Sequence, residues 1–329
     1  MPIAKDNYSG NAKGGTEAMK NRLVSSVAPD LLDNFQIFVS RVHEELSDKH
    51  VRILWCHDLA EDPENNHLAN GGWQRFHKFV FASHWQMRGY IERFNIPWNK
   101  CIVIRNAITP IDWQNKDRSK IKLVYTPTPH RGLNILYPVF DKLSQEYDNI
   151  ELDVFSSFKL YGWAERDAQF ASLFDLLEKH PKINYHGTVP NEQLRQELAK
   201  SHIFAYPSTW AETSCICLME AMSAGLICVH SNYGALPETA ANWTHMYQYD
   251  QNIHQHANMF YSVLKAAIDD LMVMDDDTYI SKIRAPKSYA DVFYNWDLVS
   301  MQWNALLESL VNEPRNIVAT GGPLFEYRT

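Results

Sequence analysis

The chain has 329 residues, of which 45% are hydrophobic and 21% charged, and it carries a formal net charge of −8. This length and composition are typical of a globular protein with two domain cores. The negative charge argues against a dedicated nucleic-acid binder, which usually carries a basic surface. The first 110 residues hold nearly equal numbers of basic and acidic side chains, which leaves room for an anionic partner at that end.

The first residues of the chain and the spacing of its cysteines favour a cytoplasmic location for the protein. The first residues lack the apolar core of a secretory signal, and no apolar run approaches the ~20 residues that span a bilayer. The cysteines follow no zinc-binding spacing, and we expect reduced thiols at Cys56, Cys101, Cys215, Cys217 and Cys228.

Short apolar segments alternate with amphipathic segments along the chain, which predicts α/β architecture with ligands at the carboxyl ends of parallel strands. Strands are expected at Phe35–Ser40, Val51–Cys56, Lys78–Ala82, Cys101–Ile104, Ile121–Tyr125, Ile150–Phe155, Ile183–His186, Ile203–Tyr206 and Leu226–His230. Helices are expected at Thr16–Ala28, Leu133–Glu146, Asn191–Lys200, Ser214–Ala224, Ile253–Met274 and Ser288–Leu310. A domain boundary is expected within Asn106–Lys120, where the apolar periodicity lapses.

A glycine-rich loop precedes the first expected helix. Gly10 and Gly15 have the outer spacing of a phosphate-binding P-loop, but Thr16 occupies the lysine position, so a nucleoside triphosphatase is not expected. Such a loop lets backbone N–H groups approach an anion at a helix N-terminus. A simple turn would explain the same residues.

Two glutamates, Glu212 and Glu220, are separated by seven residues near the expected helix Ser214–Ala224. Glu212 would lie in the preceding turn, with Thr213 or Ser214 as a helix cap. Because Glu220 would lie up to ~12 Å further along the helix axis, the two carboxylates suit the two ends of a long ligand. The alternative is that the two glutamates bind no ligand and lie on the surface of a core helix.

The segment from Glu212 to Glu238 resembles glycosyltransferase family 4, whose members are retaining enzymes of the GT-B fold with a Glu-x7-Glu motif. Five further segments resemble family motifs in the expected order: Gly14-Gly15-Thr16-Glu17, Trp55-Cys56-His57-Asp58, Ile104-Arg105-Asn106-Ala107-Ile108, His130-Arg131-Gly132-Leu133 and His186-Gly187-Thr188-Val189-Pro190. Tyr294-Asn295-Trp296 resembles the aromatic start of the family's final helix.

The resemblance implies two Rossmann-like domains that face a cleft. It implies an acceptor-side domain at 1–108, a donor domain at 109–288, a helix at 289–312 that crosses back to the first domain, and a tail at 313–329. No metal or cofactor is implied, since the nucleoside-diphosphate sugar is itself the donor substrate.

The resemblance also assigns roles to residues. It implies that Glu220 binds the donor ribose and that Glu212, with the amides of Thr213, Ser214 and Cys215, binds the transferred sugar. Arg131 and the backbone of Gly14 and Gly15 would neutralise the diphosphate. Val189 would contribute to donor binding, and His57 would contact the sugar or the acceptor hydroxyl.

One position departs from the family pattern. A second basic residue is usual five positions before Arg131, where this chain has Thr126. Lys13 and Lys159 are candidates to supply the missing charge.

Two other groups of residues have simpler explanations. Asp275-Asp276-Asp277 satisfies the Asp-x-Asp manganese motif of another glycosyltransferase fold, but its position favours an acidic helix cap. The aromatic and basic residues of segments 73–79 and 85–94 permit a peripheral membrane contact, although ordinary packing is favoured.

The sequence therefore predicts a retaining, metal-independent glycosyltransferase. The donor would be a UDP-, GDP- or ADP-sugar, and the acceptor a glycan, a lipid or a modified nucleobase, with a nucleic-acid acceptor not favoured. A nucleotide-sugar epimerase on the same fold and a non-catalytic nucleotide-sugar binder are the alternatives.

Overall fold

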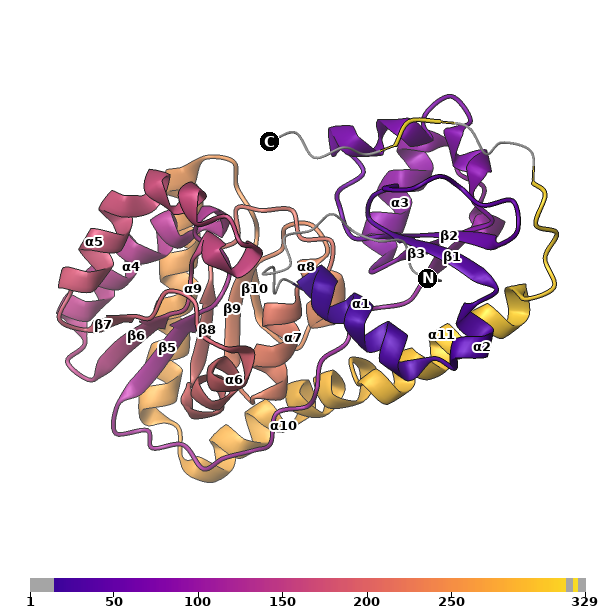
Figure 1. Ribbon diagram of the computed structural model, residues 1–329. Helices are drawn as coiled ribbons and strands as arrows, with labels where there is room; N and C mark the ends of the chain where they lie inside the picture. The colour runs from indigo at the N-terminus through magenta and orange to yellow at the C-terminus, as the bar shows by residue number, and fades with distance from the viewer. Residues whose placement is uncertain (1–14, 318–321, 325–329) are drawn as a thin grey trace. The chain divides into compact units, whose positions relative to one another are not determined.

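The computed structural model describes residues 15–317 and 322–324, and it divides into two compact units (Figure 1). Unit 1 comprises the described residues up to Ala107 and those from Trp296 onward, and unit 2 comprises Ile108–Asn295. The final helix therefore belongs to the same unit as the beginning of the chain.

Unit 1 is built on a parallel four-stranded sheet with the order β1-β2-β3-β4. The strands are β1 (Phe35–Val39), β2 (Val51–Cys56), β3 (Lys78–Phe81) and β4 (Cys101–Val103). Every residue of β1 and β2 is buried, as expected for strands covered on both faces. The α-helices of this unit are α1 (Gly15–Ser26), α2 (Pro29–Leu32), α3 (His84–Phe94) and α11 (Trp296–Leu310).

Unit 2 contains a six-stranded parallel sheet with the order β10-β9-β8-β5-β6-β7. The strands are β5 (Ile121–Tyr125), β6 (Ile150–Val154), β7 (Ile183–Tyr185), β8 (Ile203–Tyr206), β9 (Ile227–Ser231) and β10 (His245–Tyr247). The chain proceeds outward from β5 to β7, then returns to place β8 on the other side of β5. The order thus reverses between β5 and β8, where doubly wound sheets bind ligands.

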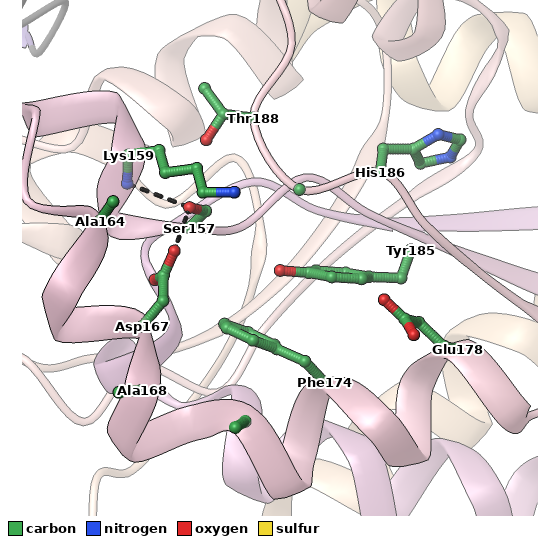
Figure 2. A pocket seen from close by; sticks show the side chains of 12 residues that line it. Ser157, Lys159, Ala164, Asp167, Ala168, Phe174, Glu178, Tyr185, His186 and Thr188 are labelled. Carbon is green, nitrogen blue, oxygen red and sulfur yellow. Dashed lines mark hydrogen bonds between the residues drawn. The ribbon is translucent and has the colours of Figure 1, made fainter.

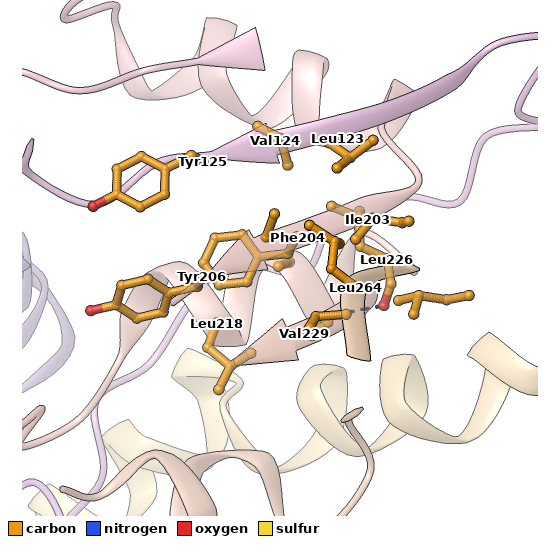
Figure 3. Close-up of a cluster of buried hydrophobic side chains, with 14 of the residues drawn as sticks. Leu123, Val124, Tyr125, Ile203, Phe204, Tyr206, Leu218, Leu226, Val229 and Leu264 are labelled. Atoms are coloured by element: carbon orange, nitrogen blue, oxygen red, sulfur yellow. Dashed lines mark hydrogen bonds between the residues drawn. The ribbon is translucent and has the colours of Figure 1, made fainter. Parts of the chain in front are cut away.

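Helices cover both faces of this sheet (Figure 1). One face carries α4 (Leu133–Glu146), α5 (Ala171–Lys179) and α9 (Ile253–Val273). The other face carries α6 (Asn191–Lys200), α7 (Ile216–Ser223), α8 (Leu236–Ala240) and α10 (Asp276–Phe293). Side chains from β5, β8 and β9 meet helix residues such as Leu218 and Leu264 in a continuous apolar core (Figure 3).

The nine predicted strands are confirmed to within one residue at each end, and five of the six predicted helices to within two residues. The helix predicted at Ser288–Leu310 is wrong, because α10 ends at Phe293 and α11 starts at Trp296. The carbonyl of Tyr294 accepts a 2.7 Å hydrogen bond from the amide of Ile108, and Asn295 pairs with Ile108 as an isolated parallel bridge. This pairing takes the place of the helical hydrogen bond that the Tyr294 carbonyl would otherwise accept, at the point where the chain leaves unit 2.

The segment that enters unit 2 is held by hydrogen bonds to its helices. The amide of Ile111 donates to Ser223 Oγ over 2.8 Å, and Arg195 donates to the carbonyls of Thr109 and Pro110. The Lys116 amine donates to three carbonyls, including that of Ala224 at the end of α7 over 2.8 Å. Burial lowers the pKa of this amine to about 7.

Asp275 caps α10 by accepting a 2.7 Å bond from the Thr278 amide, so the prediction of an acidic helix cap is confirmed. All five cysteines are free; three are buried, whereas Cys101 and Cys217 are half-buried. Among the described residues, no helix is both long and apolar enough to cross a membrane.

A tryptophan pair attaches α11 to the sheet of unit 1. The rings of Trp55 in β2 and Trp303 in α11 meet edge to face with centroids 4.8 Å apart, and Trp303 is fully buried. Such aromatic pairs stabilise beyond the area that they bury.

We predict that Trp303→Ala lowers the free energy of unfolding by about 3–5 kcal/mol, because it leaves a large cavity under α11. Met301, on the same helix, is 68% exposed, so Met301→Ala should change stability by less than about 0.5 kcal/mol. Urea unfolding followed by circular dichroism measures both; similar losses in the two variants would contradict this role of Trp303.

Candidate functional site in unit 2

The loops that leave β5 and β8 form the candidate site at the point of strand reversal. The β5 loop contains the short 3-10 helix η4 (Pro129–Arg131) and then Gly132, and the β8 loop begins at Pro207. Gly132 has φ +119°, and a Cβ atom at this position would lie 2.1 Å from the carbonyl oxygen of Pro207. Only glycine permits this approach of the two backbones, which brings Arg131 beside the second loop.

Arg131 and Glu212 form the central ion pair of the site. Arg131 Nη1 lies 2.7 Å from Glu212 Oε1, which also accepts a 2.5 Å hydrogen bond from the Tyr206 hydroxyl. The Glu212 side chain is 5% exposed, and that of Arg131 is 23% exposed. The Arg131 Nε is buried and has no hydrogen-bond partner among the described residues. This N–H group is therefore an unsatisfied buried donor beside the ion pair.

A second glycine contact fixes the backbone of Glu212. The carbonyl of Glu212 accepts a 2.7 Å bond from the Ala235 amide, and Glu212 forms a bridge with Gly234. Gly234 has φ +64°, and a Cβ atom here would lie 2.6 Å from the Glu212 nitrogen. The loop after β9 thus holds the carboxylate-bearing turn in place.

The start of α7 differs from the expected capping. Neither Thr213 nor Ser214 caps the helix; the N-cap position is Cys215, and no side chain accepts a hydrogen bond there. Thr213 and Ser214 are half-buried, and within the described part of the chain Ser214 Oγ has no hydrogen-bond partner. No side-chain cap therefore occupies the first amide groups of α7.

Glu220 lies inside α7 and is only 7% exposed. Burial raises the pKa of its carboxyl to about 7, although Arg195 and a hydrogen bond from the Asn191 side chain oppose this shift. This environment contradicts the alternative in which both glutamates lie on the surface.

A pocket of about 690 Å³ opens at the carboxyl ends of β6 and β7 (Figure 2). The stacked rings of Phe174 and Tyr185, 4.9 Å apart, form part of its wall. Asp167 shapes the loop beside it by accepting bonds from Ser157 Oγ over 2.5 Å and from the Phe158 amide over 2.8 Å. Lys159 is exposed and also lines the pocket, on this same loop.

The predicted His186–Pro190 segment reaches the same pocket. His186, Gly187 and Thr188 line it, whereas the half-buried side chain of Val189 packs against the core of unit 2. The imidazole of His186 stacks on Phe155 at 4.3 Å and lies 2.7 Å from Asp153 Oδ1.

The remaining predicted residues lie elsewhere. His57 follows β2 in unit 1, where burial lowers its pKa to about 4, so it is neutral at pH 7. Gly15 is the first residue of α1, but Gly14 and Lys13 lie outside the described residues. Thr126, in the position of the usual second basic residue, is buried at the end of β5.

Several residues of this region were not predicted from the sequence. Tyr206 is the last residue of a predicted strand, and nothing in the sequence around it indicates that its hydroxyl donates to Glu212. Asp167 and Phe174 lie on helices that were not predicted, η6 (Ala164–Phe170) and α5. The apolar spacing of Leu173, Leu177 and Phe174 could have revealed α5.

Known proteins resemble both the sequence and the fold. Residues 112–270 match the family model described as glycosyl transferases group 1. The chain is 25% identical over 141 residues to a subunit of the phosphatidylinositol N-acetylglucosaminyltransferase of Homo sapiens, covering 41% of this chain and 28% of that protein. It is 28% identical over 168 residues to the Arabidopsis thaliana protein of the same name, covering 48% and 35%. The chain thus spans about a third of these relatives.

Solved structures cover nearly the whole chain. A glycosyltransferase from Rickettsia africae ESF-5 superposes with a TM-score of 0.64 at 13% identity, covering 93% of this chain and 84% of that one. The lipopolysaccharide glycosyltransferase WaaG gives 0.59 at 12% identity, covering 88% and 80%.

The chain has the GT-B fold. The predicted fold class is therefore confirmed. Anabaena Alr3699/HepE in complex with UDP-glucose has the same fold, with a TM-score of 0.60 at 15% identity, covering 89% of this chain and 77% of that one. In the GT-B chain described here, the Arg131–Glu212 pair lies within the segment that matches the family model.

We predict that Gly132→Ala lowers the free energy of unfolding by at least about 2 kcal/mol more than Gly187→Ala. Both glycines have positive φ, but a Cβ atom at Gly187 meets nothing within 4 Å, whereas at Gly132 it overlaps the Pro207 carbonyl. The Gly187→Ala variant therefore measures the cost of a side chain at positive φ without a steric overlap. Equal losses in urea unfolding would mean that the contact with Pro207 contributes nothing.

Proposed function

We propose that the protein is a retaining glycosyltransferase that transfers a sugar from a nucleoside-diphosphate sugar to an acceptor. The observation that carries this proposal is the Arg131–Glu212 pair at the strand reversal, inside the segment similar to glycosyl transferases group 1. The glucosaminyltransferase names of the relatives and the UDP ligands of fold neighbours make UDP-sugars the first donors to test.

Arg131 would stabilise the leaving diphosphate. As the bond between the anomeric carbon and the diphosphate oxygen breaks, negative charge grows on the phosphate oxygens, and a fixed guanidinium stabilises it without rearrangement. In this scheme the acceptor oxygen bonds to the anomeric carbon on the same face, and the acceptor proton moves to the departing phosphate oxygen. The scheme requires neither a protein nucleophile nor a metal ion.

Other residues would position the donor. Glu212, with the amides of Thr213 to Cys215, would bind the transferred sugar, and Glu220 would accept hydrogen bonds from the ribose. The pocket lined by Lys159, Tyr185 and His186 would receive the nucleobase end of the donor. In unit 1, the neutral His57 would contact the sugar or the acceptor hydroxyl as a hydrogen-bond partner.

Arg131 would neutralise most of the diphosphate charge, because Thr126 stands where the family usually has a second basic residue. We predict that Arg131→Ala raises the barrier to turnover by about 2–4 kcal/mol, and that Arg131→Lys recovers part of the rate, since lysine keeps the charge without the planar fork. Labelled UDP-glucose and UDP-N-acetylglucosamine are incubated with each variant, and free UDP and sugar products are measured with and without EDTA.

This experiment also separates the alternatives. A changed sugar that remains attached to UDP would indicate an epimerase, and binding without turnover would indicate a non-catalytic binder. Removing Arg131 also leaves Glu212 with one fewer partner, which costs stability. Turnover is therefore expressed per folded molecule; a destabilised Arg131→Ala variant with unchanged turnover would refute the diphosphate role. Loss of activity in EDTA, restored by manganese, would refute the metal-free scheme.

The pKa of Glu220 predicts a pH dependence for donor binding. Because the pKa in the folded protein is about 7, the carboxyl loses its proton as the pH rises from 6 to 8. An ionised carboxylate is the stronger acceptor for ribose hydroxyls, so UDP affinity should increase over this range.

At pH 8, Glu220→Gln should weaken UDP binding about tenfold and remove the part of the pH dependence that belongs to Glu220. Titration calorimetry measures UDP affinity for both proteins. The pH dependence that comes from the ionisation of UDP itself is the same in both, so the comparison removes it. Identical affinities across the range would exclude Glu220 from the ribose site.

A further inference from the structure

Two arginines are buried at the amino edge of the unit 1 sheet. Arg52 is the second residue of β2, and Arg75 is the last residue of the 3-10 helix η2 (Gly72–Arg75), which precedes β3. Their exposed fractions are 0% and 2%, and Arg52 Nε donates to the Arg75 carbonyl over 2.6 Å. Because His57 follows the other end of β2, this edge is opposite the one that carries that histidine. The function proposed above uses neither arginine.

Neither guanidinium forms an ion pair with an acidic side chain among residues 15–317 and 322–324. Within this range the Arg52 guanidinium bonds only to backbone carbonyls, and its Nη2 reaches just one, that of Ile317, over 3.5 Å. Arg75 donates from Nε to the Gly72 carbonyl over 3.3 Å and from Nη2 to His67 Nδ1 over 2.5 Å. Arginine is almost never fully buried without a partner of opposite charge, because a buried charge is costly.

Two buried donors in this cluster have no acceptor. Arg75 Nη1 has no hydrogen-bond partner in the described part of the chain, and neither has His67 Nε2. Burial, together with the charges of Arg75 and Arg41, lowers the pKa of His67 to about 3, so this imidazole is neutral at pH 7. Because its Nδ1 accepts the bond from Arg75, its Nε2 carries the hydrogen and is a donor. An unpaired buried donor costs free energy, so a group that brings acceptor oxygens would stabilise the cluster.

The C-terminal segment, of which residues 311–317 and 322–324 are described, covers this cluster with its backbone. The Pro314 carbonyl accepts a 2.8 Å hydrogen bond from His77 Nε2. A Cβ atom at Gly322 would lie 2.3 Å from Arg75 Nη1, so the Gly322 backbone lies directly against the unpaired donor. Pro314 and Gly322 are themselves exposed. A single layer of chain thus separates the Arg75 guanidinium from solvent at this point.

Attachment of the C-terminal segment does not account for two charges here. A neutral side-chain amide donates equally well to backbone carbonyls such as those of Gly72 and Ile317, and replacing a buried charge by a neutral residue of similar volume is often harmless or stabilising. The exposed Asp48, whose charge acts on Arg52, forms no ion pair with it among the described residues. Two neighbouring guanidiniums suit a phosphate group, because several charge-assisted hydrogen bonds can reach its oxygens from different directions.

We propose that Arg52 and Arg75 form a binding site for a phosphate group, and that the Gly322 backbone moves off Arg75 Nη1 when the phosphate binds. The phosphate oxygens accept bonds from this nitrogen and from Arg52 Nη2, whose present contact is long. The phosphate comes either free from solution or from the headgroup of an anionic lipid, since both present the same oxygens. The site lies in unit 1 and is independent of the diphosphate role proposed for Arg131 in unit 2.

Equilibrium dialysis with labelled inorganic phosphate at constant ionic strength tests the site. All proteins carry Arg131→Ala, so that phosphate bound at Arg131 does not contribute. Arg75→Gln removes both the charge and the Nη1 donor, and circular dichroism checks that it folds. Arg118→Gln is the matched control, because the Arg118 side chain is 15% exposed and donates to two backbone carbonyls, but also forms an ion pair with Asp276.

The parent protein should bind phosphate, and Arg75→Gln should weaken this binding at least about tenfold, the loss expected for a charge-assisted hydrogen bond. Arg118→Gln should stay within about twofold of the parent, since it lies in the other unit. Equal phosphate affinities in the parent and in Arg75→Gln would overturn the proposal.

Gly322→Ala tests the cover and does not depend on the stability of the Arg75 variant. Its methyl group overlaps Arg75 Nη1 in the covered arrangement, and φ +148° is unfavourable for alanine. Both effects disfavour the covered form alone, so phosphate affinity should rise at least about threefold. An unchanged or lower affinity would overturn the assignment of Gly322 as the cover.

Co-sedimentation with phosphatidylcholine vesicles, with and without phosphatidic acid, distinguishes the two sources of phosphate. Sedimentation that requires phosphatidic acid and is lost in Arg75→Gln identifies the lipid headgroup. Phosphate binding in dialysis without such sedimentation identifies free phosphate. If neither assay detects binding that depends on Arg75, the two arginines only fasten the C-terminal segment and the proposal is overturned. None of these outcomes depends on turnover of a nucleotide sugar.

Discussion

The close approach of Gly132 to the Pro207 carbonyl is the constraint on which the candidate site depends. Two loops that leave neighbouring parallel strands on opposite sides of a strand reversal would otherwise diverge as each turns toward its own helix. Here the absence of one side chain lets them meet, and the ion pair between Arg131 and Glu212 spans the junction. A cation and an anion are thereby fixed side by side before any ligand arrives, which is how a preorganised electrostatic site differs from a flexible surface pair.

The two buried glutamates differ in their partners. Glu212 is held by a guanidinium and a phenol and belongs to a charged network. Glu220 has no such ion pair among those of the described residues, and burial raises the pKa of its carboxyl to about 7. A helix and its preceding turn can therefore place two chemically distinct carboxylates eight positions apart, one suited to a strongly polar ligand group and one sensitive to pH.

The sequence predicted the strands well because most are short, apolar and buried on both faces. Such strands stand out in the sequence as short runs of apolar residues. It predicted Arg131, Glu212 and Glu220 as site residues through a resemblance, since the spacing of two glutamates alone does not identify a ligand. It did not predict the break at Tyr294, because the hydrogen bond that interrupts the helix comes from Ile108, 186 positions earlier in the chain. For the same reason it missed Tyr206 and Arg195, whose partners lie on other elements.

The pairing of Ile108 with Asn295 has a consequence for how such a protein can be built. The two ends of unit 2 are hydrogen-bonded to each other, so the unit begins and ends at the same point of its surface. A domain with adjoining termini can be inserted into a loop of another protein, or replaced by a homologous domain, without stretching the host chain. Units of this kind can thus be exchanged during evolution as single modules.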